Sequence, residues 1–334
     1  HSMRKVFLMV AAAAAMLIAT GFTACKSNST QTPKVIDIYV AGNDESGTET
    51  VAKVWKNGKE LYALTDGSKR AFGNSVFVVG GDVYTAGFED NGTNNVPKVW
   101  KNDKELYDLT DGSKNGSARA IFVADDKVYT AGYEDGVAKF WKNKTGTNLT
   151  NSSNSAVAEA IFVAGSNVYT AGREIVGSKT IVKVWKKDKE LFALTNTSNN
   201  ANAYSVFVVG EDVYTAGSEY NGTNWVAKVW KNKKEIFHTD GSKHALAYSV
   251  YVVGDDVYVA GYEGNPAKVW KNGEELYELT NEGNAYSMVV HNGDVYVTGY
   301  EREVSGNVPK VWKNGKELYS LDDKGEGNSI FIVE

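Results

Sequence analysis

The chain has 334 residues, a formal net charge of −5 and 42% hydrophobic residues, so it holds enough apolar material for a sizeable core. The mild acidity argues against a nucleic-acid partner, because that function needs a concentrated basic face. Cys25 is the only cysteine. An intramolecular disulfide is therefore excluded, and packing alone must hold the fold together.

The N-terminal segment has the pattern of an export signal. Residues 1–2 precede the first methionine and are interpreted as part of an expression tag. Residues 3–24 begin with two basic residues and continue with an apolar stretch, 6–19, that is too short to cross a bilayer comfortably. We interpret residues 3–24 as a signal peptide.

The end of this segment, GFTAC at residues 21–25, resembles the lipobox of Bacteroidetes-type bacterial lipoproteins, although Phe22 stands where leucine is usual. In that family the cysteine becomes the first mature residue and carries the lipid. The resemblance implies a lipidated Cys25, a polar tether over residues 25–34, and export to the outer membrane, on its periplasmic or its surface face. The alternative is a plain secretory signal with an incidental cysteine.

From residue 35 to residue 334 the chain repeats one unit seven times. The phrase KVWKNGKELYALT and its variants return every 40 to 45 residues, and VYTAGYE returns in step with it. The tryptophans in register are Trp55, Trp100, Trp141, Trp185, Trp230, Trp270 and Trp312. A repeat of this length is typical of solenoids and propellers.

Each repeat reads as four short strands in chain order. In the copy that begins at Tyr248 these are YSVYVVG, VYVAGYE, AKVWKNG and EELYELT. The runs are rich in Val, Tyr, Phe and Trp, and Gly, Asn and Asp separate them. Asn-Gly pairs such as Asn57-Gly58 indicate tight hairpins, because both residues tolerate a positive φ.

The two ends of the repeat region complement one another. The first copy lacks an opening strand and starts at Ile36, and the chain finishes with an unaccompanied opening strand at residues 328–333. The sequence therefore predicts an all-β fold, a seven-bladed β-propeller of four-stranded antiparallel blades whose first blade is closed by the C-terminal strand. It resembles bacterial β-propeller repeat lipoproteins, and VYVTGYE at Val295 is similar to YVTN-type repeats. Propellers host many functions, so this likeness implies a fold only.

Two charged positions recur in every copy. The acids are Asp44, Glu89, Glu134, Glu174, Glu219, Glu263 and Glu301, and the lysines are Lys53, Lys98, Lys139, Lys183, Lys228, Lys268 and Lys310. We expect Glu134 to lie opposite Lys139 and Gly132 opposite Trp141. Exposed cross-strand ion pairs are the first interpretation, and a cation-binding ring of acids is the alternative. The repeated tryptophans are interpreted as core between blades, with sugar binding as the alternative.

Positions that vary between copies escape the packing rule of the blade and supply the candidate site. Two such columns are expected near one face, around the mouth of the channel, where tyrosines, two arginines and a carboxylate gather. Trp225 lies outside the repeat register, in a predicted loop on that face. The candidate ligand-binding residues are Arg119, Glu159, Arg173, Tyr204, Trp225, Tyr248, Tyr262, Tyr286 and Tyr300. The alternative is neutral variation on a solvated rim.

Catalytic chemistry has little support in the sequence. Outside residue 1 the histidines are His238, His244 and His291, and His291 falls on the opposite face from His244, so we expect no metal site and no cofactor. Three hypotheses stay open: a monomeric, non-catalytic lipoprotein that binds a protein, peptide or glycan; a scaffold subunit of an envelope complex; and a glycan-acting hydrolase or lyase that uses Glu159. The first two are favoured.

Overall fold

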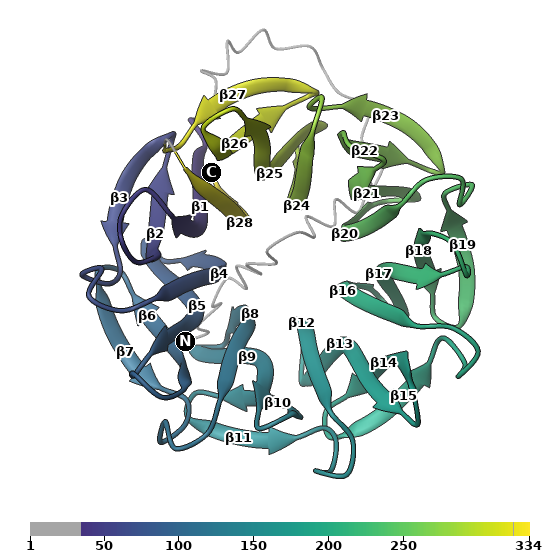
Figure 1. The fold of residues 1–334 in the computed structure, drawn as a ribbon, viewed down its shortest axis with the longest axis horizontal. Helices are drawn as coiled ribbons and strands as arrows, with labels where there is room; N and C mark the ends of the chain where they lie inside the picture. Colours follow the sequence, from purple (N-terminus) through teal and green to yellow (C-terminus); the bar gives the residue numbers. More distant parts are fainter. Residues whose placement is uncertain (1–34, 323) are drawn as a thin grey trace, which may run out of the picture.

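The structure is a computed structural model that describes residues 35–322 and 324–334. The described chain forms seven four-stranded sheets arranged as blades around a central axis (Figure 1). The predicted seven-bladed propeller is therefore confirmed. The predicted signal peptide, Cys25 and the whole of the tether lie outside the described residues. Within those residues, no helix is long and apolar enough to span a bilayer.

We number the blades in chain order, with strands given from the axis outward. Blade 1 comprises β28 (Gly325–Val333), β1 (Asp37–Asp44), β2 (Val51–Lys56) and β3 (Lys59–Ala63). Blade 2 comprises β4 (Ala71–Val79), β5 (Asp82–Asp90), β6 (Asn95–Lys101) and β7 (Lys104–Asp108). Blade 3 comprises β8 (Gly116–Ala124), β9 (Lys127–Glu134), β10 (Val137–Lys142) and β11 (Thr145–Asn148). Blade 4 comprises β12 (Ala156–Ala164), β13 (Asn167–Val176), β14 (Lys179–Lys186) and β15 (Lys189–Ala193).

The last three blades follow the same order. Blade 5 comprises β16 (Ala201–Val209), β17 (Asp212–Tyr220), β18 (Trp225–Lys231) and β19 (Lys234–His238). Blade 6 comprises β20 (Ala245–Val253), β21 (Asp256–Glu263), β22 (Ala267–Lys271) and β23 (Glu274–Glu278). Blade 7 comprises β24 (Gly283–His291), β25 (Asp294–Glu303), β26 (Gly306–Lys313) and β27 (Lys316–Ser320).

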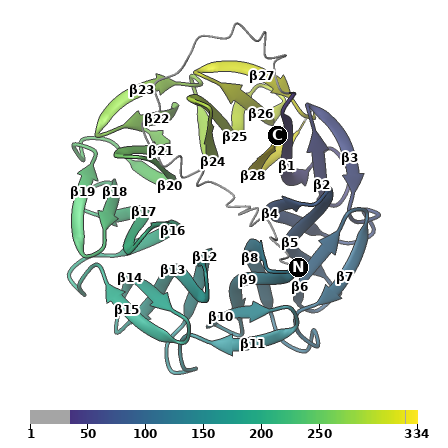
Figure 2. The same cartoon turned by 180° about the vertical axis from the view of Figure 1, so that it is seen from behind.

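The ring closes inside blade 1, as predicted. β28 pairs antiparallel with β1, and Phe331 lies opposite Tyr39. Figure 2, seen from behind, shows β28 on the axial side of β1, where the innermost strand of every other blade lies. Ile38 and Trp55 of blade 1 also share a buried cluster with Tyr296 of blade 7. Closure therefore removes the free β edge that an open array would expose.

The core lies between the blades. The seven repeated tryptophans are at most 4% exposed, and they join the valines and alanines of neighbouring strands in the buried core. A further series of aromatic rings connects adjacent innermost strands, as in Phe77–Phe122 at 4.9 Å between ring centroids. The interpretation of the tryptophans as core is confirmed.

The predicted Asn-Gly hairpins take the expected backbone. Asn57 has φ 51° and Gly58 has φ 79°. The Asn57 side-chain oxygen accepts a hydrogen bond from the Ile38 backbone N–H (2.8 Å), and its amide donates to Asp37 (2.9 Å). The turn residue therefore also fastens the start of β1, which explains why asparagine recurs at this position.

The predicted register between the second and third strands is wrong by two residues. In blade 3, Glu134 lies opposite Val137, Lys139 opposite Gly132, and Trp141 opposite Thr130. The cause is the connection, which is a two-residue turn through Asp135 and Gly136 with φ 53° and 73°. The predicted pairing of Glu134 with Lys139 would require a longer loop.

Gly132 accordingly has another reason to be glycine. A Cβ at Gly132 would meet the Ser117 carbonyl oxygen at 2.0 Å and the Ala118 Cα at 3.1 Å. The backbone of β8 crosses it closely because β8 bulges at this point. The indole of Trp141 is not what requires the glycine.

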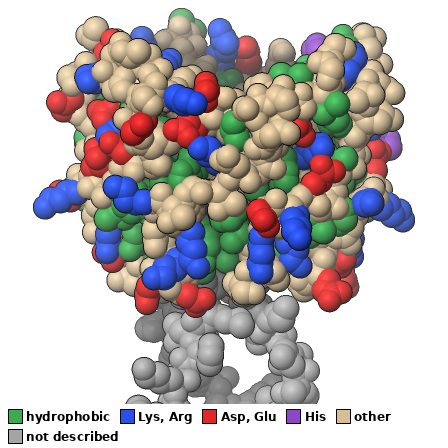
Figure 3. All heavy atoms as spheres, turned by 90° about the horizontal axis from the view of Figure 1, so that it is seen from below, with side chains coloured by type: hydrophobic (Ala, Val, Ile, Leu, Met, Phe, Trp, Pro, Cys, Tyr) green, Lys and Arg blue, Asp and Glu red, His purple; other side chains and the backbone are tan. Residues whose placement is uncertain are grey.

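All seven acid–lysine pairs form, but they are less exposed than expected. The amines of Lys98, Lys268 and Lys310 belong to residues that are 5–8% exposed, and Lys310 contacts Glu301 (2.7 Å), Glu303 (3.1 Å) and Glu317 (3.0 Å). The pairs are diagonal, as the corrected register requires. The other pairs of the same kind join Lys53 to Asp44, Lys98 to Glu89, Lys139 to Glu134, Lys183 to Glu174, Lys228 to Glu219 and Lys268 to Glu263. Figure 3 shows basic and acidic side chains interspersed over the outer wall.

Candidate functional site

A β-bulge places the variable residue of each opening strand. In every blade one residue of the innermost strand has no partner on the second strand, as Arg119 does between Ala118 and Ala120. The bulged residues are Asn74, Arg119, Glu159, Tyr204, Tyr248, Tyr286 and Asn328. A bulged residue is released from the alternation of the pleat and can be aimed at a neighbour. This explains why the column tolerates such different side chains.

The bulged residues of neighbouring blades contact one another around the axis. The Asn74 amide donates to the Ala118 carbonyl oxygen (2.7 Å), and the Asn328 amide donates to the Gly73 carbonyl oxygen (3.0 Å). The column therefore forms a ring on the innermost strands, which surround the central axis in Figure 1. We call this ring, together with Arg173, Tyr262 and Tyr300 of the second strands, the channel mouth.

Tyrosines fill the part of the mouth on blades 5 to 7. The Tyr248 ring lies 5.1 Å from the Tyr204 ring, 5.0 Å from the Tyr286 ring and 6.2 Å from the Tyr262 ring, between centroids. The Tyr286 ring is 5.8 Å from the Tyr300 ring. Burial and the neighbouring phenols raise the pKa of Tyr248 far above its usual range. All five side chains are half-buried, so they offer ring surface together with neutral hydroxyl donors.

Blades 3 and 4 supply the charged part of the mouth. The Glu159 carboxylate pairs with Arg173 (2.7 Å) and with Arg119 Nε (3.5 Å), and the Arg119 guanidinium lies 5.7 Å from the Tyr133 ring centroid. Two guanidinium groups share one carboxylate, so this sector keeps an excess positive charge. Because Glu159 is held by both arginines, it is badly placed to serve as a free general acid.

Sequence reasoning missed a second carboxyl group near the mouth. Glu326 lies opposite Asn43 in blade 1, accepts a hydrogen bond from the Asn307 amide (3.1 Å) and also interacts with Tyr286. It belongs to a third variable column, the residue two before the bulge, which includes Phe72 stacked on Phe88 (5.1 Å). The signal was the same variation between copies, at a position that we did not compare.

Trp225 lies apart from the tyrosines. It is not in a loop but is the first residue of β18, opposite Tyr220, and it is half-buried. Its ring lies 5.7 Å from the Tyr220 ring, and its backbone N–H donates to His244 Nδ1 (3.1 Å). The structure therefore brings eight of the nine candidates together at the mouth and leaves Trp225 at the end of a strand in blade 5.

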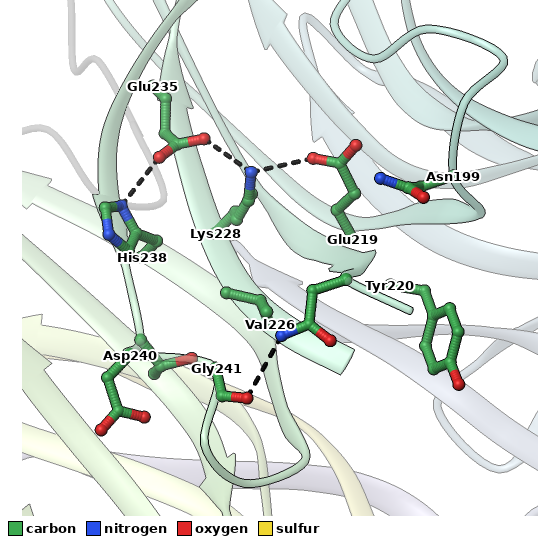
Figure 4. Close-up of a pocket in the computed structure, with 11 residues that line it drawn as sticks. Asn199, Glu219, Tyr220, Val226, Lys228, Glu235, His238, Asp240 and Gly241 are labelled. Carbon is green, nitrogen blue, oxygen red and sulfur yellow. Dashed lines mark hydrogen bonds and ion pairs between the residues drawn. The ribbon is translucent and has the colours of Figure 1, made fainter. Parts of the chain in front are cut away.

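The outer part of blade 5 holds a cavity of about 310 Å³. Here the chain runs from His238 directly to Thr239, without the leucine that blade 2 has at Leu109, and the cavity at the matching place in blade 2 is about 190 Å³. Figure 4 shows Lys228 between Glu219 and Glu235, both at 2.8 Å, with His238 on Glu235. These charges satisfy one another, so we place the candidate site at the mouth instead.

The described residues contain no group of three or more histidine, cysteine or acidic side chains that could hold a metal ion. The sequence TDGSK occurs at residues 65–69, 110–114 and 239–243. These segments are turns, since Asp66 and Asp240 accept the backbone N–H of the serine two residues later (2.9 and 2.8 Å).

Comparison with known proteins gives a fold likeness without an activity. No protein-family model matches the chain, and no curated protein matches it in sequence. Among solved structures it is similar to the crystal structure of Porphyromonas gingivalis dipeptidyl peptidase 4, with a TM-score of 0.43 and 9% sequence identity. The match covers 85% of this chain and 58% of that one. At this identity and TM-score it carries no information about what this chain binds.

Proposed function

We propose that this chain is a non-catalytic ligand-binding module that holds a protein, peptide or glycan ligand at the channel mouth. One observation carries the proposal: Tyr204, Tyr248 and Tyr286, with Tyr262 and Tyr300, form one contiguous aromatic surface on three successive blades. They stand at bulged or adjacent positions where the fold does not require tyrosine.

The chemistry of the mouth suits such a ligand. Half-buried tyrosines combine rigid apolar area with a polar tip, which favours stacking against sugar rings or peptide side chains. Arg119 and Arg173 offer planar donors for an anionic or carbonyl group. A ligand that spans both parts of the mouth would contact the tyrosines of blades 5 to 7 at one end and the two arginines of blades 3 and 4 at the other.

The envelope location is part of the proposal. The lipobox-like GFTAC at residues 21–25 and the polar stretch that follows support a propeller held at the outer membrane by a lipid on Cys25. Its ligand would then be a component of the envelope or a molecule that reaches it. Mass spectrometry of the membrane-extracted protein tests this point, because a Cys25→Ala chain would lose the lipid mass and enter the soluble fraction.

Peptide and glycan arrays probed with the purified full chain test the binding function. Tyr204→Ala and Tyr248→Ala should each reduce binding at least about tenfold, because each removes part of the central stacking surface. The matched control is Tyr277→Ala, which removes a half-buried tyrosine from the outer strand β23 and should leave binding unchanged. Ligands that bind equally to all these variants would refute the mouth as the site.

A scaffold function has its own supporting observation, the Trp225–Tyr220 pair beside the exposed His244. If the propeller serves as a subunit of an envelope complex through this pair, Trp225→Ala should abolish copurification of the partner, and Tyr248→Ala should not. A hydrolase or lyase would instead show turnover of an array glycan that Glu159→Gln removes, and binding without turnover would exclude it.

A further inference from the structure

Glu326 is a half-buried acid without a basic partner among the described residues. Its Oε1 accepts from the Asn307 amide at 3.1 Å, and its other neighbours are the Tyr286 hydroxyl and the carboxyl group of Glu45. Within the described chain, no lysine, arginine or histidine lies at ion-pair distance from it. Burial, and then the charge of Glu45, raise the pKa of Glu326. Withholding a counter-ion from a buried carboxyl costs stability.

The seven repeated acids of the blades have a different environment from that of Glu326. Each member of the repeated acid ring contacts a lysine of its own sheet, as Glu301 contacts Lys310 at 2.7 Å. The fold therefore has a simple means of neutralising a carboxylate on these strands. At Glu326 no lysine of the described chain plays this part.

The tyrosines beside Glu326 also lack a basic partner. Over much of the molecule a lysine or arginine head lies against a tyrosine ring, as Lys313 does over Tyr296 at 5.1 Å. Among the described residues no such contact involves Tyr248, Tyr262, Tyr286 or Tyr300. The rings contact one another, and no lysine or arginine head of the described chain lies over their faces, which attract cations.

The rings next to the carboxyl group are held in place. The Asn284 amide donates to the Tyr286 hydroxyl (3.3 Å) and to the Tyr300 hydroxyl (3.1 Å). Arg302, which acts electrostatically on Tyr300, is turned to Glu282, with Nε 3.5 Å from the carboxyl oxygen, and both are exposed. The Glu326 sector is thus a fixed set of aromatic rings with an acid at its edge and no internal cation.

We propose that the ligand of the mouth carries an organic cation, a primary or quaternary ammonium group, held by the Glu326 carboxylate and the ring faces of Tyr286 and Tyr300. This deepens the proposed function and rests on it. The ammonium group supplies the missing counter-charge of Glu326 and gains from the quadrupoles of the rings. It also gives the mouth a direction, because Arg119 and Arg173, in blades 3 and 4, suit the anionic or carbonyl part of the same ligand.

The test compares choline with 3,3-dimethylbutan-1-ol, which has nearly the same shape and no charge. Binding to the purified full chain is measured by calorimetry or by ligand-observed NMR. Choline should bind at least about tenfold more tightly than the alcohol, as expected for a cation that meets both rings and a carboxylate. Equal affinities, or no choline binding, would overturn the proposal.

Substitutions locate the effect. Glu326→Gln should weaken choline binding at least about fivefold and leave the alcohol unchanged, whereas Glu211→Gln, an exposed acid of the turn between β16 and β17, should change neither. Tyr286→Phe should keep choline binding, because the ring face is retained, and Tyr286→Leu should lose it. Choline binding that ignores Glu326→Gln and Tyr286→Leu would place the cation elsewhere and refute the assignment.

The arrays separate this inference from the function on which it rests. Ligands that need Tyr204 and Tyr248 but carry no cationic group would leave the binding function standing and refute the cation. Ligands that ignore every mouth substitution would refute the binding function itself. Cationic ligands whose affinity falls with Glu326→Gln would support both.

Discussion

Two acids of blade 1 lie on adjacent residue pairs and have opposite environments. Asp44, opposite Gly325, pairs with Lys53 at 2.8 Å. Burial pushes the pKa of Asp44 upward, but hydrogen bonds from Lys53 and Ser46 outweigh it and hold that pKa below its usual range. Glu326, opposite Asn43, lacks a cation, so burial raises its pKa. The repeated acid is neutralised by a lysine of its own sheet, and Glu326 is not.

This difference separates stability from binding. The repeated acids, lysines and tryptophans recur in every copy because each one contacts a partner in its own blade or in the next. The bulged residues of the mouth differ because the bulge frees them from that requirement. Glu326, two residues before the bulge of blade 1, lacks a cation partner among the described residues. Substitution of a residue that recurs in every copy should therefore lower stability without a direct effect on ligand binding. Substitution of a mouth residue should weaken ligand binding with little effect on stability.

The largest effect on stability should come from the seven repeated tryptophans. Trp141 is 1% exposed between blades, so Trp141→Ala removes buried apolar area and leaves a cavity. We expect the free energy of unfolding to fall by about 3–5 kcal/mol, measured by urea titration.

Trp225→Ala is the matched control, because Trp225 is half-buried at the start of β18. It should cost about 1 kcal/mol. An equal loss in the two variants would show that the repeat register does not mark the core.

Asp44→Asn should have the next largest effect. The side chain is 12% exposed and bonded to a lysine that Glu60 and Asp322 also contact, so we expect a loss of about 1.5 kcal/mol at pH 7. Because folding lowers the pKa of Asp44, its contribution is present above the unfolded value, 3.8, and is lost as the pH falls through the folded value. The difference between wild type and variant should therefore be the same in urea titrations at pH 7 and pH 5, and smaller at pH 3. A difference that is constant with pH would exclude the ion pair as its source.

The fold was predictable because the same pattern of four strands occurs in seven copies. Tryptophan spacing gave the blade count, and the unaccompanied strand at residues 328–333 gave the closure that β28 and β1 confirm. The register was not predictable in the same way. A change of one residue in the length of a turn shifts every residue pair between the two strands that it joins. The two-residue turn Asp135-Gly136 is shorter than the predicted register requires. Turn length depends on local backbone geometry, which the apolar pattern does not report.

The site was predictable in outline only. Variation between copies located Tyr204, Tyr248 and Tyr286. The small residues that flank each of them, Ala before and Ser after, do not by themselves indicate the bulge that gathers them. Glu326 was overlooked because its meaning lies in what surrounds it, Asn307, Tyr286 and the absence of a nearby cation in the described chain. These neighbours come from other strands, so no single repeat reveals them.

A smaller effect is expected from the serine that joins neighbouring innermost strands. Ser75 Oγ accepts the Ile121 backbone N–H at 3.2 Å, from blade 2 to blade 3, and β8 has no sheet neighbour on its axial side. Ser75→Ala leaves this N–H without its partner and should cost about 1 kcal/mol in urea titration. The exposed Ser68→Ala should change the free energy of unfolding by less than about 0.5 kcal/mol. Equal costs would show that the bond between blades contributes nothing.

The smallest effect should have the opposite sign, and it tests the comparison most directly. Folding raises the pKa of Glu326, so its favourable contribution is present below the unfolded pKa and is lost as the pH rises through the folded value. At pH 7 the wild type therefore bears the cost of an ionised, half-buried carboxylate, and Glu326→Gln should be as stable or more stable, by about 0.5 kcal/mol or less. The variant's advantage should disappear at pH 4, when both side chains are neutral. Choline should raise the melting temperature of the wild type and not that of the variant, because the cation compensates a charge that only the wild type has. If the Glu326→Gln variant is less stable than the wild type at pH 7, Glu326 stabilises the fold as the repeated acids do, and the comparison fails.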